Sequence, residues 1–197
     1  MKILFAPASP YSAKVRMAAR YCGLEAQSVP VDTNADPDEL VDANPLGKIP
    51  TLIDDGMTVY DSRAIMQYLD RKSGKLLYPR NAQKRTEAEV LEALCDGITD
   101  CLLAMVYENR FRPLEKVHQP WLDRQWSKIE RSLDYLNDNL PRTTKKLHGG
   151  HFALAGLIGY LALRFDGQWE RGRPKLKNWP GKFAKFFPEY DDYKSKG

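Results

Sequence analysis

The stretch Ser9-Pro10-Tyr11-Ser12 decides the fold of this sequence. It follows a short apolar run, Lys2–Phe5, that is typical of a strand, and it opens a helical pattern over Ala13–Cys22 that Gly23 ends. Its spacing is that of a redox Cys-x-x-Cys motif with serine at both sulfur positions. Free amides and the positive end of a helix dipole favour an anion there, while disulfide exchange is excluded because the sulfurs are absent. An ordinary helix cap is the alternative interpretation.

Outward from this stretch, the first 80 residues alternate short strands with short helices. Asp55-Gly56 is a hairpin turn signal, so the two strands beside it are expected to pair antiparallel. The first two strands are joined through a helix and are expected to pair in parallel. The predicted strands are Lys2–Phe5, Gln27–Val31, Thr51–Asp54 and Met57–Tyr60, and the predicted helices are Ala13–Cys22, Asp36–Asn44 and Ser62–Lys72.

Beyond Tyr78-Pro79-Arg80-Asn81 the chain is predicted to be all helical. Apolar residues recur at steps of three and four over Ala88–Met105 and Leu122–Leu140, and Phe152–Phe165 is apolar nearly all round, as in a central buried helix. Lys175–Phe187 is predicted as one last helix, and the polar tail Tyr190–Gly197 is expected to fray. We therefore expect one domain over residues 1–78, a linker over 79–86 and a helical domain over 87–197.

Composition narrows the classes of protein. The 197 residues are 43% hydrophobic and 28% charged, with a net charge of +4 that is scattered along the chain, which argues against a dedicated nucleic-acid binder. No apolar run is long enough for a transmembrane helix, and the N-terminus turns polar too soon for a signal peptide. The widely spaced Cys22, Cys95 and Cys101 form neither a disulfide framework nor a metal site, and packing is their favoured role. A reducing cytoplasm is the expected location.

Two further motifs lie in the same half. Asn44–Leu52 reads Asn-Pro-Leu-Gly-Lys-Ile-Pro-Thr-Leu, and a cis proline just before a strand would expose the preceding amide and carbonyl for pairing with a peptide. Tyr60–Ile65 reads Tyr-Asp-Ser-Arg-Ala-Ile, which places Asp61 or Ser62 at a helix start where a carboxylate or an ammonium can bind. A plain loop and a plain helix cap are the respective alternatives.

In this order and spacing, the three motifs resemble the glutathione transferase superfamily, and the resemblance extends over essentially the whole chain. It implies a thioredoxin-like α/β N-terminal domain and an all-α C-terminal domain. The most similar members are bacterial cytosolic ones with an active-site serine. The resemblance also implies a homodimer, a role in detoxification, and glutathione as a cosubstrate with no tightly bound cofactor, no metal, no nucleic acid and no membrane.

Carried over residue by residue, the resemblance assigns a glutathione site. Ser9 matches the residue that faces the glutathione sulfur. Ile49 matches the residue whose backbone pairs with the cysteinyl part, and Pro50 matches the cis proline. Asp61 and Ser62 match the pair that binds the γ-glutamyl end. Secondary candidates are Lys48, for the glycine carboxylate, and Tyr11 and Ser12, beside the sulfur.

The implied reaction is conjugation of the glutathione thiolate to a small hydrophobic electrophile, whose identity the sequence does not give. Tyr107, Arg110, Phe111 and Arg112 near the end of a long helix are candidates for the second-substrate pocket, with packing as an equal alternative. Reduction of disulfides or peroxides, isomerisation and dehalogenation are the alternative chemistries. A binding or interaction protein without activity is the alternative of another class, because fold does not fix function.

One departure from the family concerns the buried C-terminal helix. Members usually cap it with a Ser/Thr-x-x-Asp box, whereas this chain has His148-Gly149-Gly150-His151. A neutral imidazole accepts one hydrogen bond but is a poorer cap than serine or aspartate. The sequence therefore leaves open how this helix start is satisfied.

Overall fold

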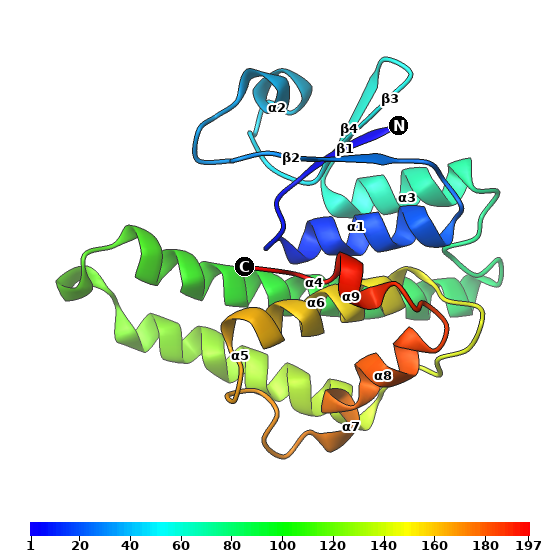
Figure 1. Cartoon of the computed structure of the whole chain (residues 1–197). Helices are drawn as coiled ribbons and strands as arrows, with labels where there is room; N and C mark the ends of the chain where they lie inside the picture. Colours follow the sequence, from blue (N-terminus) through cyan, green and yellow to red (C-terminus); the bar gives the residue numbers. More distant parts are fainter.

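The computed structural model describes residues 1–197 and begins with a four-stranded mixed sheet in the order β2-β1-β3-β4 (Figure 1). The predictions of a parallel β1/β2 pair and an antiparallel β3/β4 hairpin are confirmed. The elements of this half are β1 (Lys2–Phe5), α1 (Pro10–Tyr21), β2 (Gln27–Pro30), α2 (Asp38–Ala43), β3 (Thr51–Asp54), β4 (Met57–Tyr60) and α3 (Ser62–Lys72).

Alternation along the strands places helices on both faces of the sheet. Ile3 of β1 and Leu52 of β3, which are paired in the ladder, belong to the main core together with residues of α1 and α3. Leu4 points to the opposite face, where it packs with Leu40 and Ala43 of α2. The result is the predicted thioredoxin-like arrangement.

The second half of the chain is helical, as predicted, and α6 is its centre. Helix α6 is buried from Gly149 to Leu161 and packs against both α1 and α4 (Figure 1). This burial explains why its sequence is apolar nearly all round. The elements are α4 (Ala82–Phe111), the 3-10 turn η1 (Leu114–Lys116), α5 (Gln119–Asp138), α6 (Gly149–Arg164), α7 (Pro174–Lys177), α8 (Trp179–Ala184) and α9 (Tyr190–Tyr193).

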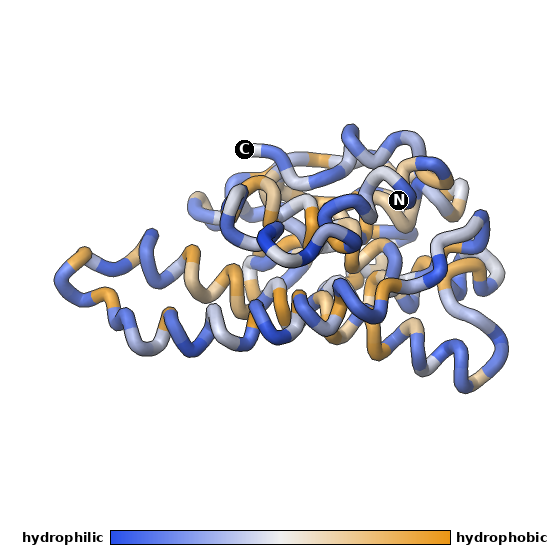
Figure 2. Tube along the Cα trace, turned by 90° about the horizontal axis from the view of Figure 1, so that it is seen from below, coloured by the Kyte–Doolittle hydropathy of each residue, from blue (hydrophilic) through white to orange (hydrophobic).

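Helices α4 and α5 are antiparallel and extend beyond the rest of the molecule (Figures 1 and 2). Figure 2 shows that hydrophilic residues predominate where the two helices meet at their free end, and that apolar segments gather in the body of the molecule. No helix has both the length and the apolar character required to cross a bilayer.

The prediction of a single helix over Lys175–Phe187 is wrong. The segment contains two short helices, α7 and α8, which meet at Asn178. Pro180 lies in the first turn of α8, where its missing amide hydrogen costs nothing, but inside one continuous helix it would break the hydrogen-bond ladder.

The expectation of a frayed tail is also wrong. Tyr190–Tyr193 forms α9, and Tyr190 is only 6% exposed. The Tyr190 hydroxyl donates to the Ala155 carbonyl of α6 at 3.2 Å, and the Lys196 amide donates to the Pro7 carbonyl at 3.0 Å. The aromatic side chains among the polar residues of this segment are what anchor it against the core.

Candidate functional site

The first turn of α1 begins at Ser9, which is its N-cap in an extended backbone conformation. The Ser9 Oγ accepts the Ser12 amide hydrogen at 3.2 Å. Ser9 can therefore be both a helix cap and a hydrogen-bond donor to an anion, because a hydroxyl oxygen that accepts this bond keeps its own hydrogen free to donate. The sequence motif thus places a hydroxyl donor and the positive end of a helix dipole at one point.

The loop before β3 is held by a buried asparagine that the sequence analysis did not single out. Asn44 Nδ2 donates to the Lys48 carbonyl at 2.8 Å, and its Oδ1 accepts the Leu46 amide at 3.0 Å. The Ile49–Pro50 peptide bond is cis, as expected. The amide and carbonyl of Ile49 have no hydrogen-bond partner within the chain, so both are free to pair with a peptide.

The start of α3 is unusual in its backbone. Asp61 has a φ of 66°, which a residue with a side chain adopts at a cost of about 1–3 kcal/mol. Its Oδ1 accepts the Arg63 amide at 2.9 Å and caps the helix. This conformation puts the Asp61 carboxylate and the buried Ser62 at the edge of the same hollow as Ser9.

One cleft of about 610 Å³ contains nearly all of the predicted site residues. It lies between the loops of the first half and the helices α4 and α6. Ser12 and Arg112 are the exceptions. The side chain of Ser12 is fully buried, Arg112 is paired with Glu108, and neither residue lines the cleft. The predicted residues that line it are Ser9, Tyr11, Lys48, Ile49, Pro50, Asp61, Ser62, Tyr107, Arg110 and Phe111.

The helical wall of this cleft contains residues that the sequence analysis missed. Tyr160 and Arg164 come from the end of α6, and Asp100 comes from the middle of α4. The only signal for the first two is a tyrosine and an arginine that close an otherwise apolar helix. Asp100 gives no signal in the sequence, since an acidic residue on a helix is usually a solvated one.

Comparison with known proteins identifies the family of this chain. Residues 8–72 match the family model "Glutathione S-transferase, N-terminal domain". The uncharacterized GST-like protein YibF of Escherichia coli (strain K12) is 32% identical over 170 residues, which are 83% of each chain.

Solved structures of other proteins are similar to this chain over nearly its full length. A glutathione S-transferase of Methylobacillus flagellatus with glutathione bound has a TM-score of 0.86 and 31% identity, covering 99% of each chain. One from Methylobacterium radiotolerans in complex with glutathione sulfonate has a TM-score of 0.90 and 29% identity, covering 100% of this chain and 95% of that one. The chain belongs to the glutathione transferase superfamily. The prediction that the protein is a transferase enzyme is confirmed at the level of the superfamily.

Within this glutathione transferase, Tyr11 lines the cleft but its hydroxyl is already engaged. It donates a hydrogen bond to Asp100 of α4. Burial, together with this carboxylate, raises the pKa of the Tyr11 hydroxyl above its ordinary value. Tyr11 therefore stays protonated and is a wall of the site, whereas the Ser9 hydroxyl has no competing acceptor.

Buried charges behind α1 fix the positions of the first turns of α1 and α3. Lys14 is 1% exposed, and its Nζ donates to Asp96 of α4 at 2.8 Å and to Glu92 at 3.2 Å. Asp96 also lies 3.3 Å from Nε of Arg63, which belongs to α3. These contacts link both α1 and α3 to α4, and the cost of desolvating the buried charges offsets much of their attraction.

None of the three cysteines of this glutathione transferase lines the cleft. Cys95 is fully buried, Cys22 and Cys101 are partly buried, and all three are free. Burial raises the pKa of each thiol above its ordinary value. Their predicted packing role agrees with this placement.

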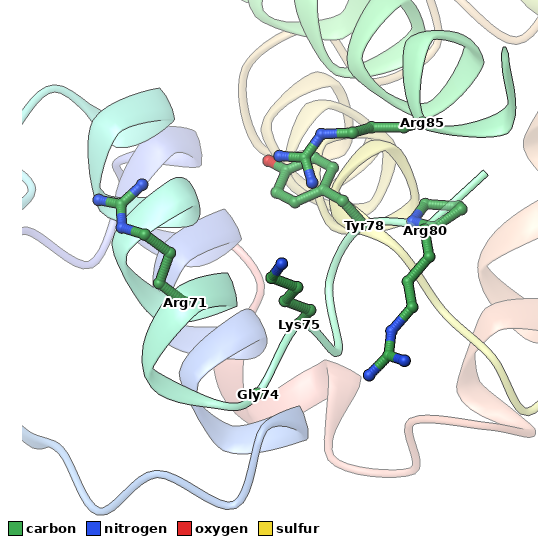
Figure 3. A pocket seen from close by; sticks show the side chains of 7 residues that line it. Arg71, Gly74, Lys75, Tyr78, Arg80 and Arg85 are labelled. Atoms are coloured by element: carbon green, nitrogen blue, oxygen red, sulfur yellow. The ribbon is translucent and has the colours of Figure 1, made fainter. Parts of the chain in front are cut away.

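A second hollow, of about 540 Å³, lies where α3 leads into α4 (Figure 3). Arg85 lies over the ring of Tyr78 with its Cζ 5.0 Å from the ring centroid, and its Nε donates to Glu89 at 2.8 Å. This second hollow is lined by Arg71, Gly74, Lys75, Tyr78, Pro79, Arg80 and Arg85. None of the residues predicted to bind glutathione lines it.

Proposed function

We propose that this protein binds glutathione in the cleft and transfers its thiolate to a small electrophile. The observation that carries the proposal is the meeting, in one cleft, of the Ser9 hydroxyl at the start of α1, the unpaired backbone of Ile49, and the Asp61–Ser62 pair. Solved relatives that are about 30% identical to this chain contain bound glutathione.

The proposed pose follows from the chemistry of each group. The Ile49 amide and carbonyl pair with the cysteinyl part of the tripeptide. Asp61 binds the γ-glutamyl ammonium, and Ser62 with the free amides of α3 binds the adjacent carboxylate. Lys48, which is exposed at the cleft, neutralises the glycine carboxylate. The sulfur then faces Ser9.

Ser9 is proposed to stabilise the thiolate. A thiol has a pKa near 8.5, so only a small fraction is ionised at neutral pH. Lowering that pKa by about two units requires about 2.7 kcal/mol of differential stabilisation. One charge-assisted hydrogen bond contributes about 1.5–3 kcal/mol and a helix dipole about 0.3–1, which together are of this size. The cleft contains no cysteine, so glutathione supplies the only thiol in the proposed reaction.

The test is the ultraviolet absorbance of the glutathione thiolate on the protein, titrated from pH 5 to 9. We expect Ser9→Ala to raise the pKa of the bound thiol by about one to two units and to lower kcat/KM by about 10- to 100-fold below neutral pH. A pKa that is equal in wild type and variant would contradict the role of Ser9. Saturable binding without any thiolate would favour a different glutathione chemistry or a binding protein.

We also propose a domain division, a cellular location and an oligomeric state for this protein. The first is the division into residues 1–78, a linker and residues 87–197, although α4 already begins at Ala82. The second is a reducing cytoplasm, with which three unpaired cysteines agree. The third is a homodimer, because Met57, Tyr60 and Val90 expose 54%, 38% and 60% of their surface and would gain from burial. Sedimentation at micromolar concentration tests the dimer, and a monomer would overturn it.

A further inference from the structure

The helical wall of the cleft contains cations that no carboxylate neutralises. Arg110 of α4 and Arg164 of α6 both line the cleft, are exposed, and take part in no salt bridge. The neighbouring Arg112 shows the contrast, since its Nε is paired with Glu108 at 2.7 Å and it does not line the cleft. Arg63, which also lines the cleft, is paired with Asp96 and Asp100.

The two free guanidinium groups line the same cleft as Tyr160. Both lie close enough to the buried hydroxyl of Tyr160 to lower its pKa against the larger, opposing effect of burial. Cζ of Arg110 also lies 5.8 Å from the ring centroid of Tyr107. A group bound beside Tyr160 would therefore be within the field of two positive charges.

Beside these cations lies a pair of exposed aromatic rings. Tyr107 and Phe111 meet edge to face with their centroids 5.3 Å apart, and they are 46% and 63% exposed. Leu103, one turn before Tyr107, continues the apolar strip on the same wall. A planar apolar group can pack there, while a cation cannot approach the two arginines without repulsion.

The acidic residues of the cleft do not offset these charges. Asp61 belongs to the proposed γ-glutamyl end, Asp100 is engaged by Tyr11 and Arg63, and Asp36 belongs to the loop that follows β2. None of them forms an ion pair with Arg110 or Arg164. The helical wall is thus both aromatic and positive, whereas a site for neutral hydrophobic molecules needs no free cation.

We propose that the second substrate is an aromatic electrophile that carries a carboxylate, with its ring on Tyr107 and Phe111 and its carboxylate bound by Arg110 and Arg164. This inference rests on the proposed function. The planar guanidinium fork matches a carboxylate through two parallel hydrogen bonds, which makes arginine more selective for this group than lysine. Arg110 and Arg164 act as specificity residues, and the sulfur site is separate from them.

The test uses a matched pair of electrophiles, 4-chloro-3-nitrobenzoate and its methyl ester. The glutathione sulfur attacks the ring carbon that bears chlorine, a C–S bond forms, and chloride leaves with the electrons of the broken C–Cl bond. The thiol proton goes to solvent. Each enzymatic kcat/KM is divided by the rate constant of the uncatalysed reaction, which removes the intrinsic difference in reactivity between acid and ester.

We expect the wild type to favour the acid by about tenfold or more, the size of one charge-assisted hydrogen bond at a partly exposed site. Arg110→Gln and Arg164→Gln are each expected to raise KM for the acid by about tenfold and to leave the ester within about twofold. Arg112→Gln, the matched control, changes neither substrate. Added salt should weaken the preference for the acid.

Binding of the two products separates this proposal from the proposed function. The glutathione conjugates of acid and ester are titrated by calorimetry, which needs no turnover. If neither electrophile reacts but the acid conjugate binds about tenfold tighter, and Arg110→Gln removes that difference, the anionic site stands and the transferase reaction fails. Equal affinities for the two conjugates, no binding of either, or an arginine variant that weakens glutathione itself would each overturn the proposal.

Discussion

Helices α1 and α6 pack against each other, yet their first turns face different surroundings. The first turn of α1 opens into the cleft, and Ser9 at its start is partly exposed. The first turn of α6 is buried, and His148 and His151 occupy the positions of its cap. Both helix starts carry the same partial positive charge. Only the α1 start is open to a ligand. The proposed anion site at Ser9 therefore depends on the surroundings of this helix start and not on its cap.

The histidine cap of α6 works through the ring of His151. Its Nδ1 accepts the His148 amide hydrogen at 3.1 Å, and its Nε2 lies 3.3 Å from the Arg142 carbonyl. These two partners fix the neutral tautomer with hydrogen on Nε2. His148 itself contributes less, because its buried Nδ1 has no partner. The substitution of histidines for the usual serine and aspartate is therefore satisfied, but only while His151 is uncharged.

Gly156 lies where α6 contacts the first turn of α1, and a substitution there is expected to disturb the α1 start more than any other change considered. A Cβ atom on Gly156 would lie 2.7 Å from the Pro10 carbonyl, in the first turn of α1. We expect Gly156→Ala to lower the free energy of unfolding by about 3 kcal/mol, the upper range for overpacking, because a backbone atom must move. Chemical denaturation measures this loss. Glutathione affinity should fall too, since the shift displaces Ser9.

A control for this prediction exists in the neighbouring helix. Gly97 lies inside α4 with nothing within 4 Å of its would-be Cβ. Gly97→Ala is expected to raise the free energy of unfolding by about 0.5–1 kcal/mol, because alanine restricts the unfolded chain and favours helix. Equal effects of the two substitutions would show that Gly156 does not set the distance between α6 and α1.

The two helix starts also differ in their response to acid. Burial lowers the pKa of His151 from 6.5 to about 4 and that of His148 to about 3. As the pH falls below 6.5, the unfolded chain binds protons that the folded protein does not, so the free energy of unfolding decreases until the folded pKa is reached. We expect His151 alone to contribute a loss of about 2 kcal/mol between pH 7.5 and 5.

Denaturation as a function of pH measures this loss, and the double variant His148→Ser, His151→Asp isolates it. That variant restores the usual capping box, and its stability should change little over the same range because no buried imidazole is left at the α6 start. His118→Gln, which replaces the third and exposed histidine, should keep the wild-type slope. A wild-type slope in the double variant would mean that carboxylates elsewhere cause the acid sensitivity.

The start of α1 was predictable from the sequence because it depends on local chemistry. Strand, Ser-Pro-Tyr-Ser and amphipathic helix follow one another within about twenty residues, and the cis Ile49–Pro50 bond and the Asp61 cap are equally local. The sheet topology followed from the same patterns. These features are fixed by residues that are near in sequence, which is what a motif records.

The helical wall was harder to predict because distant contacts decide it. Tyr107 and Phe111 were predicted as candidates near the end of a long helix, but Tyr160 and Arg164 reach the cleft only because α6 packs against α1 and α4. The tail was misread for the same reason, since Tyr190 is fixed by the Ala155 carbonyl of α6 and not by its neighbours in sequence. Ser12 was predicted to lie beside the sulfur, but its position in the first turn of α1, three residues after Ser9, directs its side chain into the core.

Ser12 gives the smallest predicted effect and the most direct comparison with Ser9. Its hydroxyl is fully buried and has no hydrogen-bond partner, so the group is desolvated without compensation. We expect Ser12→Ala to raise the free energy of unfolding by up to about 1 kcal/mol and to leave the pKa of the bound thiol unchanged. Ser9→Ala, the same chemical change three residues earlier, should instead cost about 1 kcal/mol of capping and raise that pKa. A higher thiol pKa in Ser12→Ala would show that this hydroxyl reaches the sulfur after glutathione binds, and that the open first turn of α1 has two donors.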